Sequence, residues 1–169
     1  MRTDPNTPPM ADPIAYFITW STYGTWLPGD QRGWVEYRHG WQLPDPIRKL
    51  EATAKMSEDA CRLSPEQRDA VHQQIAETCK FRGWTLYEVN CRSNHLHVVV
   101  AAPAPPKVVR SQLKAWCTRK LKRLAQQQGA DIVLRENWWA ERGSQRFIND
   151  GASLEAAIIY VRDGQDSPH

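Results

Sequence analysis

The stretch that decides the fold is Tyr87-Glu88-Val89-Asn90-Cys91-Arg92-Ser93-Asn94-His95-Leu96-His97-Val98-Val99-Val100. A run of β-branched residues follows its two histidines, which are therefore predicted to begin a strand whose remainder is buried. Side chains two apart in a strand share a face, so His95 and His97 should project together while Leu96 turns into the core. Two adjacent imidazoles on a rigid strand form half of a divalent-metal site. The alternative is a pair of half-exposed histidines without a ligand.

The same stretch predicts an antiparallel hairpin. Residues 84–92 have the composition of a strand, Ser93-Asn94 suit a tight turn, and residues 95–102 form the returning strand. The paired histidines thus follow the turn directly.

A helix is predicted before the hairpin, over residues 65–82. Ser64 can cap it, Pro65 suits the first helical position, and Gln67 completes a capping box. Gly83 is a plausible C-terminal cap.

The remaining elements follow from periodicity. Residues 14–23 alternate in a β-rich composition and are predicted to form the first strand. Residues 106–129 carry apolar side chains at helical spacing and are predicted to form a helix. Short strands are expected at residues 132–134, 137–141 and 145–148, with a turn at residues 142–144.

The helix predicted at residues 106–129 has a polar face of one sign. No acidic residue interrupts its cations, which are Lys107, Arg110, Lys114, Arg119, Lys120, Lys122 and Arg123. A purely solvating face normally mixes signs to relieve repulsion. The pattern favours contact with nucleic-acid phosphates, and an ordinary solvated surface is the alternative.

The last predicted helix begins at Asp150 or Ser153, since either can cap it. Its buried stripe is predicted to consist of Leu154, Ala157, Ile158 and Val161. Tyr160 lies on the flank of that stripe. This position suits a phenol packed by its ring with the hydroxyl free at the margin of a cleft, although an ordinary packing residue would look the same.

Two side chains with oxygen ligands follow this tyrosine. They are Asp163 and Gln165, on either side of Gly164. The glycine is predicted to unwind the helix, so that an oxygen ligand can swing toward the two histidines.

A long segment without periodicity occupies residues 24–63. Insertions of this length tend to carry function. Its aromatics are interleaved with arginine, as Trp26 and Arg38 illustrate, and such side chains can stack on unpaired bases. The tryptophans could equally cover the core as a lid.

Length and composition limit the remaining choices. The 169 residues suit one domain, and a net charge of +3 permits a nucleic-acid partner without requiring one. Four scattered cysteines indicate reduced thiols rather than a disulfide frame or a zinc site. No membrane-spanning run or signal peptide is recognisable, and residues 1–13 are predicted to be a disordered leader. A cytoplasmic protein is expected.

The chain resembles a known family at these positions. Asn94-His95-Leu96-His97 before an apolar strand, with Tyr160 on a late helix, resembles the single-tyrosine HUH transposases. The stretches at residues 19–29 and 160–165 are similar to the REP-associated branch of that family, so the resemblance covers roughly residues 14–165.

The resemblance implies a fold and a domain organisation. The fold is an α+β ferredoxin-like antiparallel sheet with helices packed on one face, and the predicted order of elements agrees with it. Residues 14–165 would form a single domain with an insertion at about 24–63, followed by a tail at residues 166–169.

The resemblance also implies an activity. His95 and His97 would bind Mg²⁺ or Mn²⁺, and Tyr160 would attack single-stranded DNA at hairpin or repeat sequences, forming a 5′-phosphotyrosine during transposition. The family commonly places another ligand four residues after the tyrosine, where this chain has Gly164. Gln165 is the favoured third ligand and Asp163 its rival. The protein would be nucleoid-associated, as a monomer or a homodimer.

Two other classes remain open. A non-catalytic module on the same scaffold could bind single-stranded nucleic acid without cleaving it. A metal-dependent hydrolase could use the histidines with water as the nucleophile. Replacing Tyr160 by Phe separates these classes from the transposase.

Overall fold

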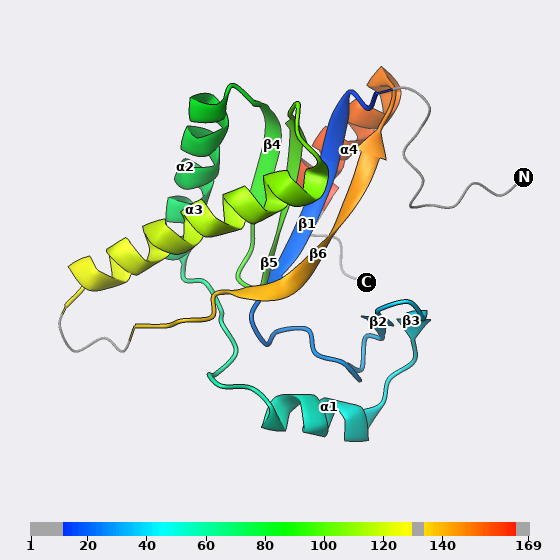
Figure 1. The fold of residues 1–169 in the computed structure, drawn as a ribbon, viewed down its shortest axis with the longest axis vertical. Helices are drawn as coiled ribbons and strands as arrows, with labels where there is room; N and C mark the ends of the chain where they lie inside the picture. The colour runs from blue at the N-terminus through cyan, green and yellow to red at the C-terminus, as the bar shows by residue number, and fades with distance from the viewer. Residues whose placement is uncertain (1–11, 130–133, 165–169) are drawn as a thin grey trace, which may run out of the picture.

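A computed structural model describes residues 12–129 and 134–164. Within these residues, Figure 1 shows a four-stranded antiparallel sheet with its helices and a separate small hairpin. The sheet consists of β1 (Ala15–Thr22), β4 (Thr85–Cys91), β5 (His95–Ala101) and β6 (Trp139–Ile148). The helices are α1 (Pro46–Ala54), α2 (Pro65–Arg82), α3 (Pro106–Gln127) and α4 (Gly151–Asp163), and the small hairpin is β2 (Trp34–Glu36) with β3 (Gly40–Gln42).

The order of strands across the sheet is β4-β5-β1-β6, and each neighbouring pair is antiparallel. This order, reached through two strand-helix-strand units, is that of a ferredoxin-like fold. The predicted α+β class is confirmed. The strand that carries the two histidines, β5, lies in the interior of the sheet, where both its edges are hydrogen-bonded.

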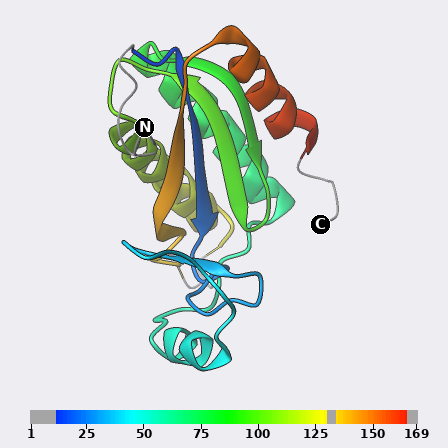
Figure 2. The same ribbon diagram turned by 90° about the vertical axis from the view of Figure 1, so that its right-hand side faces the viewer.

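Both faces of the sheet are covered. Helices α2 and α3 pack over Ile18 and Val98 on one face, whereas α4 packs through Val161 against Val99 on the other (Figure 2). Helix α4 differs from the expectation that all helices pack on one face of the sheet. The physical reason is that Val98 and Val99 point to opposite faces and both are fully buried, so β5 requires apolar cover on each side.

The predicted helix at residues 65–82 is confirmed as α2. The side chain of Ser64 accepts a hydrogen bond from the amide of Gln67 at 3.2 Å, and the Gln67 side chain accepts one from the Ser64 amide at 2.8 Å. Gly83 ends the helix with φ +71°, the left-handed conformation that favours glycine. Strong signals at both ends explain why this helix was predictable.

The predicted hairpin is confirmed as β4 and β5. The amide of Arg92 donates to the carbonyl of His95 at 2.8 Å across the turn. The carbonyl of Asn94 in turn accepts a 2.8 Å hydrogen bond from the amide of Thr22, at the end of β1. The turn that precedes the histidines is therefore fixed to the neighbouring strand.

The predicted turn at residues 142–144 is wrong. Residues 139–148 form one continuous strand, β6, paired with β1. Gly143 permits this pairing, because a Cβ there would lie 2.4 Å from the carbonyl oxygen of Thr19. The glycine marks a close approach of two backbones rather than a turn. The strand predicted at residues 132–134 falls mainly on residues outside those described.

The segment at residues 24–63 is not structureless, as it contains β2, β3 and α1. Asp30 is its buried anchor, with 4% of its surface exposed. Its carboxylate accepts hydrogen bonds from the Arg32 side chain at 2.7 and 3.0 Å and lies 3.6 Å from the Lys49 ammonium. These contacts connect the loop around Asp30 to the helix α1, which has no buried residue of its own.

We expect Asp30→Asn to destabilise this segment by about 1–3 kcal/mol, because the buried carboxylate that accepts the Arg32 hydrogen bonds and faces Lys49 is replaced by a neutral amide. The Arg32 guanidinium holds the pKa of Asp30 down at about 2, so this stabilisation is present above the ordinary pKa of 3.8 and is lost as the pH falls toward 2. Limited proteolysis of residues 24–63 as a function of pH measures it. Asp69→Asn, at an exposed position on α2, is the matched control. Equal resistance of the two variants would contradict the anchoring role.

Two further expectations concern cysteines and membranes. All four cysteines are free and buried. Of the helices in the described ranges, none combines the length and apolar character needed to cross a membrane.

Candidate active site

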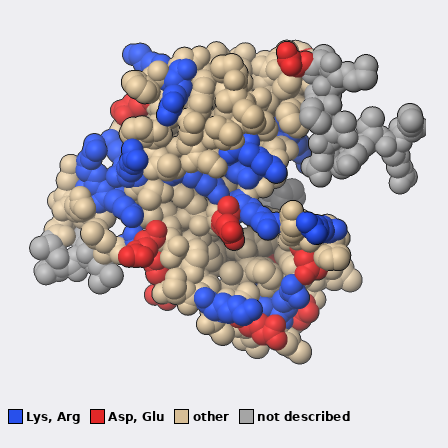
Figure 3. All heavy atoms as spheres, in the orientation of Figure 1, with Lys and Arg blue, Asp and Glu red and all other residues tan. Residues whose placement is uncertain are grey.

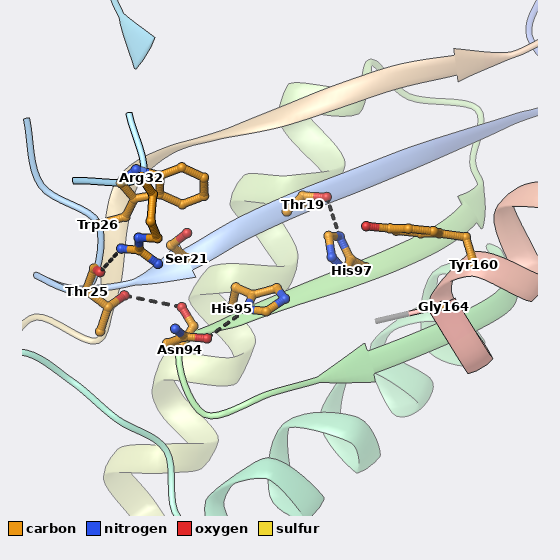
Figure 4. A pocket seen from close by; sticks show the side chains of 10 residues that line it. All are labelled: Thr19, Ser21, Thr25, Trp26, Arg32, Asn94, His95, His97, Tyr160 and Gly164. Carbon is orange, nitrogen blue, oxygen red and sulfur yellow. Dashed lines mark hydrogen bonds between the residues drawn. The ribbon is translucent and has the colours of Figure 1, made fainter. Parts of the chain in front are cut away.

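One pocket on the α4 face of the sheet collects the predicted catalytic side chains. His95, His97 and Tyr160 line this pocket, which has a volume of about 360 Å³ (Figure 4). The two imidazole ring centroids lie 5.1 Å apart, and the ring of Tyr160 lies 5.7 Å from that of His97. Residues far apart in the sequence thus meet in one cavity, which we call the catalytic pocket.

The sheet register places the histidines there. On β1, the Cα partner of His97 is Thr19 and that of His95 is Ser21, and all four residues line the catalytic pocket. Alternation along β5 turns the intervening Leu96 into the core, as predicted.

Each histidine is held through its Nδ1 atom. The Nδ1 of His97 lies 2.6 Å from the hydroxyl oxygen of Thr19, and the Nδ1 of His95 lies 2.7 Å from the side-chain oxygen of Asn94. An amide oxygen only accepts, so His95 carries its proton on Nδ1 and keeps a lone pair on Nε2. Among the described residues, neither Nε2 has a hydrogen-bond partner. A metal-binding histidine commonly has this arrangement, with one nitrogen fixed and the other available.

Burial keeps both imidazoles neutral. It lowers the pKa of His97 to about 4, with the neighbouring His95 adding to the effect. It also lowers the pKa of His95, with smaller contributions from the cations Arg92 and Arg32. Neutral imidazole is the form that binds a metal ion, so the environment favours the ligand state at neutral pH.

Tyr160 enters the pocket from the last turns of α4. Its ring contacts Phe17 at a centroid distance of 6.0 Å as well as His97, and Phe17 itself stacks on His97 at 5.3 Å. The side chain is 47% exposed, and Figure 4 shows its hydroxyl pointing toward Thr19 and His97. The ring is therefore packed, while the hydroxyl has no hydrogen-bond partner in the part of the chain that the structure describes.

Of the two candidates for the third ligand, Asp163 lies among the described residues but outside the catalytic pocket. Asp163 pairs with Arg162 at 3.2 Å, has a side chain that is 61% exposed, and does not line the catalytic pocket. Gln165 lies outside the described residues. Gly164 does line the pocket, where a Cβ would lie 3.0 Å from the ring of Tyr160. Across residues 12–129 and 134–164, no group of three His, Cys, Asp or Glu side chains could hold a metal ion.

The opposite end of the catalytic pocket is formed by Trp26 and Arg32 (Figure 4). Besides its pairing with Asp30, the Arg32 guanidinium donates to the carbonyl of Thr25 at 2.8 Å and stacks on the indole of Trp26 at 4.8 Å. Its charge is therefore rigidly placed across from the histidines.

Sequence reasoning missed Arg32, Thr19 and Phe17. Arg32 could have been found from its opposite charge to Asp30, which lies two positions away between two glycines. The other two residues depend on strand register, which the sequence does not display.

Arg38, which was predicted with Trp26 to bind DNA, lies elsewhere. Arg38 has φ +70° and stacks on Tyr37 at 5.2 Å, outside the lining of the catalytic pocket. On the same ring, Arg142 of β6 stacks at 4.1 Å, connecting the small hairpin to the sheet. Arg38 therefore does not share the catalytic pocket with Trp26.

The basic helix α3 lies on the opposite face of the sheet from the catalytic pocket. Lys and Arg side chains gather in a band across that face (Figure 3). Two of the predicted cations are used inside the fold. The Arg110 guanidinium donates to the side chain of Gln145 at 2.7 Å, and the Lys114 ammonium donates to the carbonyls of Ala140 at 2.8 Å and Arg142 at 3.2 Å.

The other five cations of α3 differ in exposure. Arg119 stacks on Trp116 at 4.8 Å. Lys107, Lys122 and Arg123 are also exposed, and Lys120 is half-buried. These side chains are available to phosphates, but none of them lines the catalytic pocket.

Lys114→Gln is expected to lower the free energy of unfolding by about 1–3 kcal/mol, because carbonyls of β6 lose their donor. Burial lowers the pKa of this ammonium to about 8, which agrees with its packed position. Lys122→Gln, on the same helix, should leave the unfolding midpoint unchanged and weaken DNA binding instead. Urea denaturation of both variants separates the roles, and an equal midpoint would disprove the structural role of Lys114.

The fold and the catalytic pocket define a ferredoxin-like protein in which a histidine pair and a helical tyrosine share one candidate active site. Residues 57–163, more than half of the chain, match the profile of the family described as "Transposase IS200 like". The chain belongs to the IS200-like transposase family, and the predicted transposase relationship is confirmed.

A solved structure agrees in fold. A REP-associated tyrosine transposase bound to a REP hairpin is similar with a TM-score of 0.53 and 11% identity, covering 95% of this chain and 70% of that chain. A candidate transposase of Deinococcus radiodurans R1 is similar with a TM-score of 0.47 and 15% identity, covering 99% of this chain and 100% of that chain. No curated protein matched the sequence.

Proposed function

We propose that this protein is a metal-dependent endonuclease and strand transferase for single-stranded DNA, acting through a 5′-phosphotyrosine on Tyr160. The observation that carries the proposal is one pocket that joins this tyrosine to two histidines with available Nε2 atoms, in a member of a transposase family. Hairpin or repeat DNA is the proposed substrate, supported by the REP hairpin bound to a transposase of similar fold.

The proposed metal ligands are the Nε2 atoms of His95 and His97. The neutral rings and the fixed Nδ1 atoms fit a divalent cation. When bound, Mg²⁺ or Mn²⁺ polarises the scissile phosphate and stabilises the charge that develops there. We assign the third ligand to Gln165, with Asp163 as the alternative.

Tyr160 supplies the nucleophile. Its phenolic oxygen loses a proton and forms a bond to the scissile phosphorus, while the bond from phosphorus to the 3′-oxygen breaks and that oxygen gains a proton. The phosphotyrosine retains a phosphodiester, so a free 3′-hydroxyl can attack it in the reverse direction. Strand transfer then requires no ATP.

Arg32 and Trp26 are proposed to hold the strand beside the histidines. The Nη1 of Arg32 has no hydrogen bond with a described residue, so it remains available to a phosphate oxygen. The half-exposed indole of Trp26 can stack on a base. Detection of a covalent complex between protein and DNA on a denaturing gel tests the function as a whole.

Thr19→Val should lower the affinity for Mn²⁺ roughly 10- to 100-fold, because the Nδ1 of His97 loses its only partner among the described residues. Thr19→Ser keeps a hydroxyl and should bind nearly as the wild type does. Calorimetric titration with Mn²⁺ measures both. A valine variant with wild-type affinity would remove Thr19 from the metal site.

A further inference from the structure

A second groove lies on the other side of Tyr160, between β6 and the first half of α4. It has a volume of about 640 Å³, and we call it the flanking groove. This volume falls within the ~300–1,000 Å³ typical of small-ligand sites. Its lining consists of Phe17, Thr19, His97, Ser144, Arg146, Phe147, Ile148, Ser153, Ala156, Ala157 and Tyr160.

The flanking groove adjoins the catalytic pocket. Both cavities are lined by Thr19, His97 and Tyr160. In the sheet register, Thr19 pairs with His97 on one side and with Ser144 of β6 on the other. A chain that crosses the sheet along this row passes the tyrosine and continues into the flanking groove.

The lining suits a polyanion. None of the described residues that line it is acidic, and Arg146 is its exposed cation. Arg146 makes no hydrogen bond or ion pair with a described residue, so its charge is available to a ligand. On the α4 side, Ser153, Ala156 and Ala157 are small and leave room for a backbone to pass. On the sheet side, the ring of Phe17 offers an apolar surface.

We propose that the flanking groove binds the nucleotides on one side of the scissile phosphate, with Arg146 contacting a DNA phosphate. The catalytic pocket, with Trp26 and Arg32, holds the nucleotides on the other side. This inference rests on the proposed action on single-stranded DNA. After attack by Tyr160, one DNA end is held covalently by the protein. The other end needs a binding site of its own if it is to remain available for resealing, and the flanking groove would provide one.

The first test measures binding without cleavage. Fluorescence anisotropy with a fluorescein-labelled thymidine homopolymer should show that Arg146→Gln weakens affinity about 3- to 10-fold and lowers the salt slope by about 0.7, the value for one phosphate contact in single strands. Arg82→Gln is the matched control, at an exposed arginine at the end of α2, on the opposite face. Equal affinities and salt slopes for the two variants would overturn the proposal.

The second test blocks the groove sterically. All native cysteines are buried, so Ala156→Cys introduces an accessible thiol in the groove wall and Glu155→Cys introduces one beside it on α4. A bulky maleimide on the first should reduce homopolymer binding at least as strongly as Arg146→Gln does, whereas the same label on the second should have little effect. Equal binding by both labelled proteins would contradict the groove.

The outcomes also separate this proposal from the proposed function. Weaker homopolymer binding in Arg146→Gln, with no covalent adduct in the wild type, would support the groove and refute cleavage. A wild-type adduct, with Arg146→Gln and labelled Ala156→Cys both equal to their controls, would support cleavage and refute the groove.

Discussion

Tyr160→Phe is expected to bind single-stranded repeat DNA with wild-type affinity and to form no covalent adduct. The phenyl ring keeps the contacts with Phe17 and His97, so the pocket and the fold should be unchanged. Only the nucleophilic oxygen is lost, and removing a nucleophile typically lowers the rate on the order of 10⁴-fold or more.

The measurement is a denaturing gel of protein incubated with labelled single-stranded repeat DNA and Mg²⁺. Wild-type protein should give a slow band that survives boiling in detergent and is absent when the metal is chelated. Tyr37→Phe, at an exposed tyrosine of the insertion, is the matched control and should keep full activity. Continued cutting by Tyr160→Phe would show that water is the nucleophile. Binding without any cutting by the wild type would favour the non-catalytic module.

The second large effect is expected at the histidine pair. His95→Ala and His97→Ala should each abolish adduct formation and strongly weaken Mn²⁺ binding, because two ligand nitrogens become one. His39→Ala, at an exposed histidine of the insertion, should change neither property.

The two variants should differ in stability. His97 is only 9% exposed and stacks on Phe17, so its truncation leaves a cavity and should cost roughly 1–3 kcal/mol. His95 is more exposed and provides the cleaner test. Full activity in a folded His95→Ala protein would remove the metal hypothesis.

Local signals in the sequence predicted much of the fold. The helix α2 was predictable to its ends because Ser64, Gln67 and Gly83 act within a few residues of the helix termini. The orientation of His95 and His97 was predictable because alternation is a property of any strand. The placement of Tyr160 at a cleft margin followed in the same way from helical periodicity.

Non-local features were not predictable. Residues 142–144, with a glycine at their centre, have the composition of a turn. The chain stays extended there because the backbone of Thr19 lies close to Gly143 in the neighbouring strand. The strands β2 and β3 have three residues each, too short for a periodic signal. The position of α3 and α4 on opposite faces separates the basic helix from the tyrosine, which no sequence pattern indicated.

Mass spectrometry of the adduct tests directly whether Tyr160 is the nucleophile. Wild-type protein is incubated with single-stranded repeat DNA and Mg²⁺, digested with nuclease and protease, and its peptides are sequenced. We expect a nucleotide phosphate attached to the peptide that contains Tyr160, with fragmentation placing it on that side chain. Cleaved DNA with this peptide unmodified, or with the phosphate on another residue, would contradict this expectation.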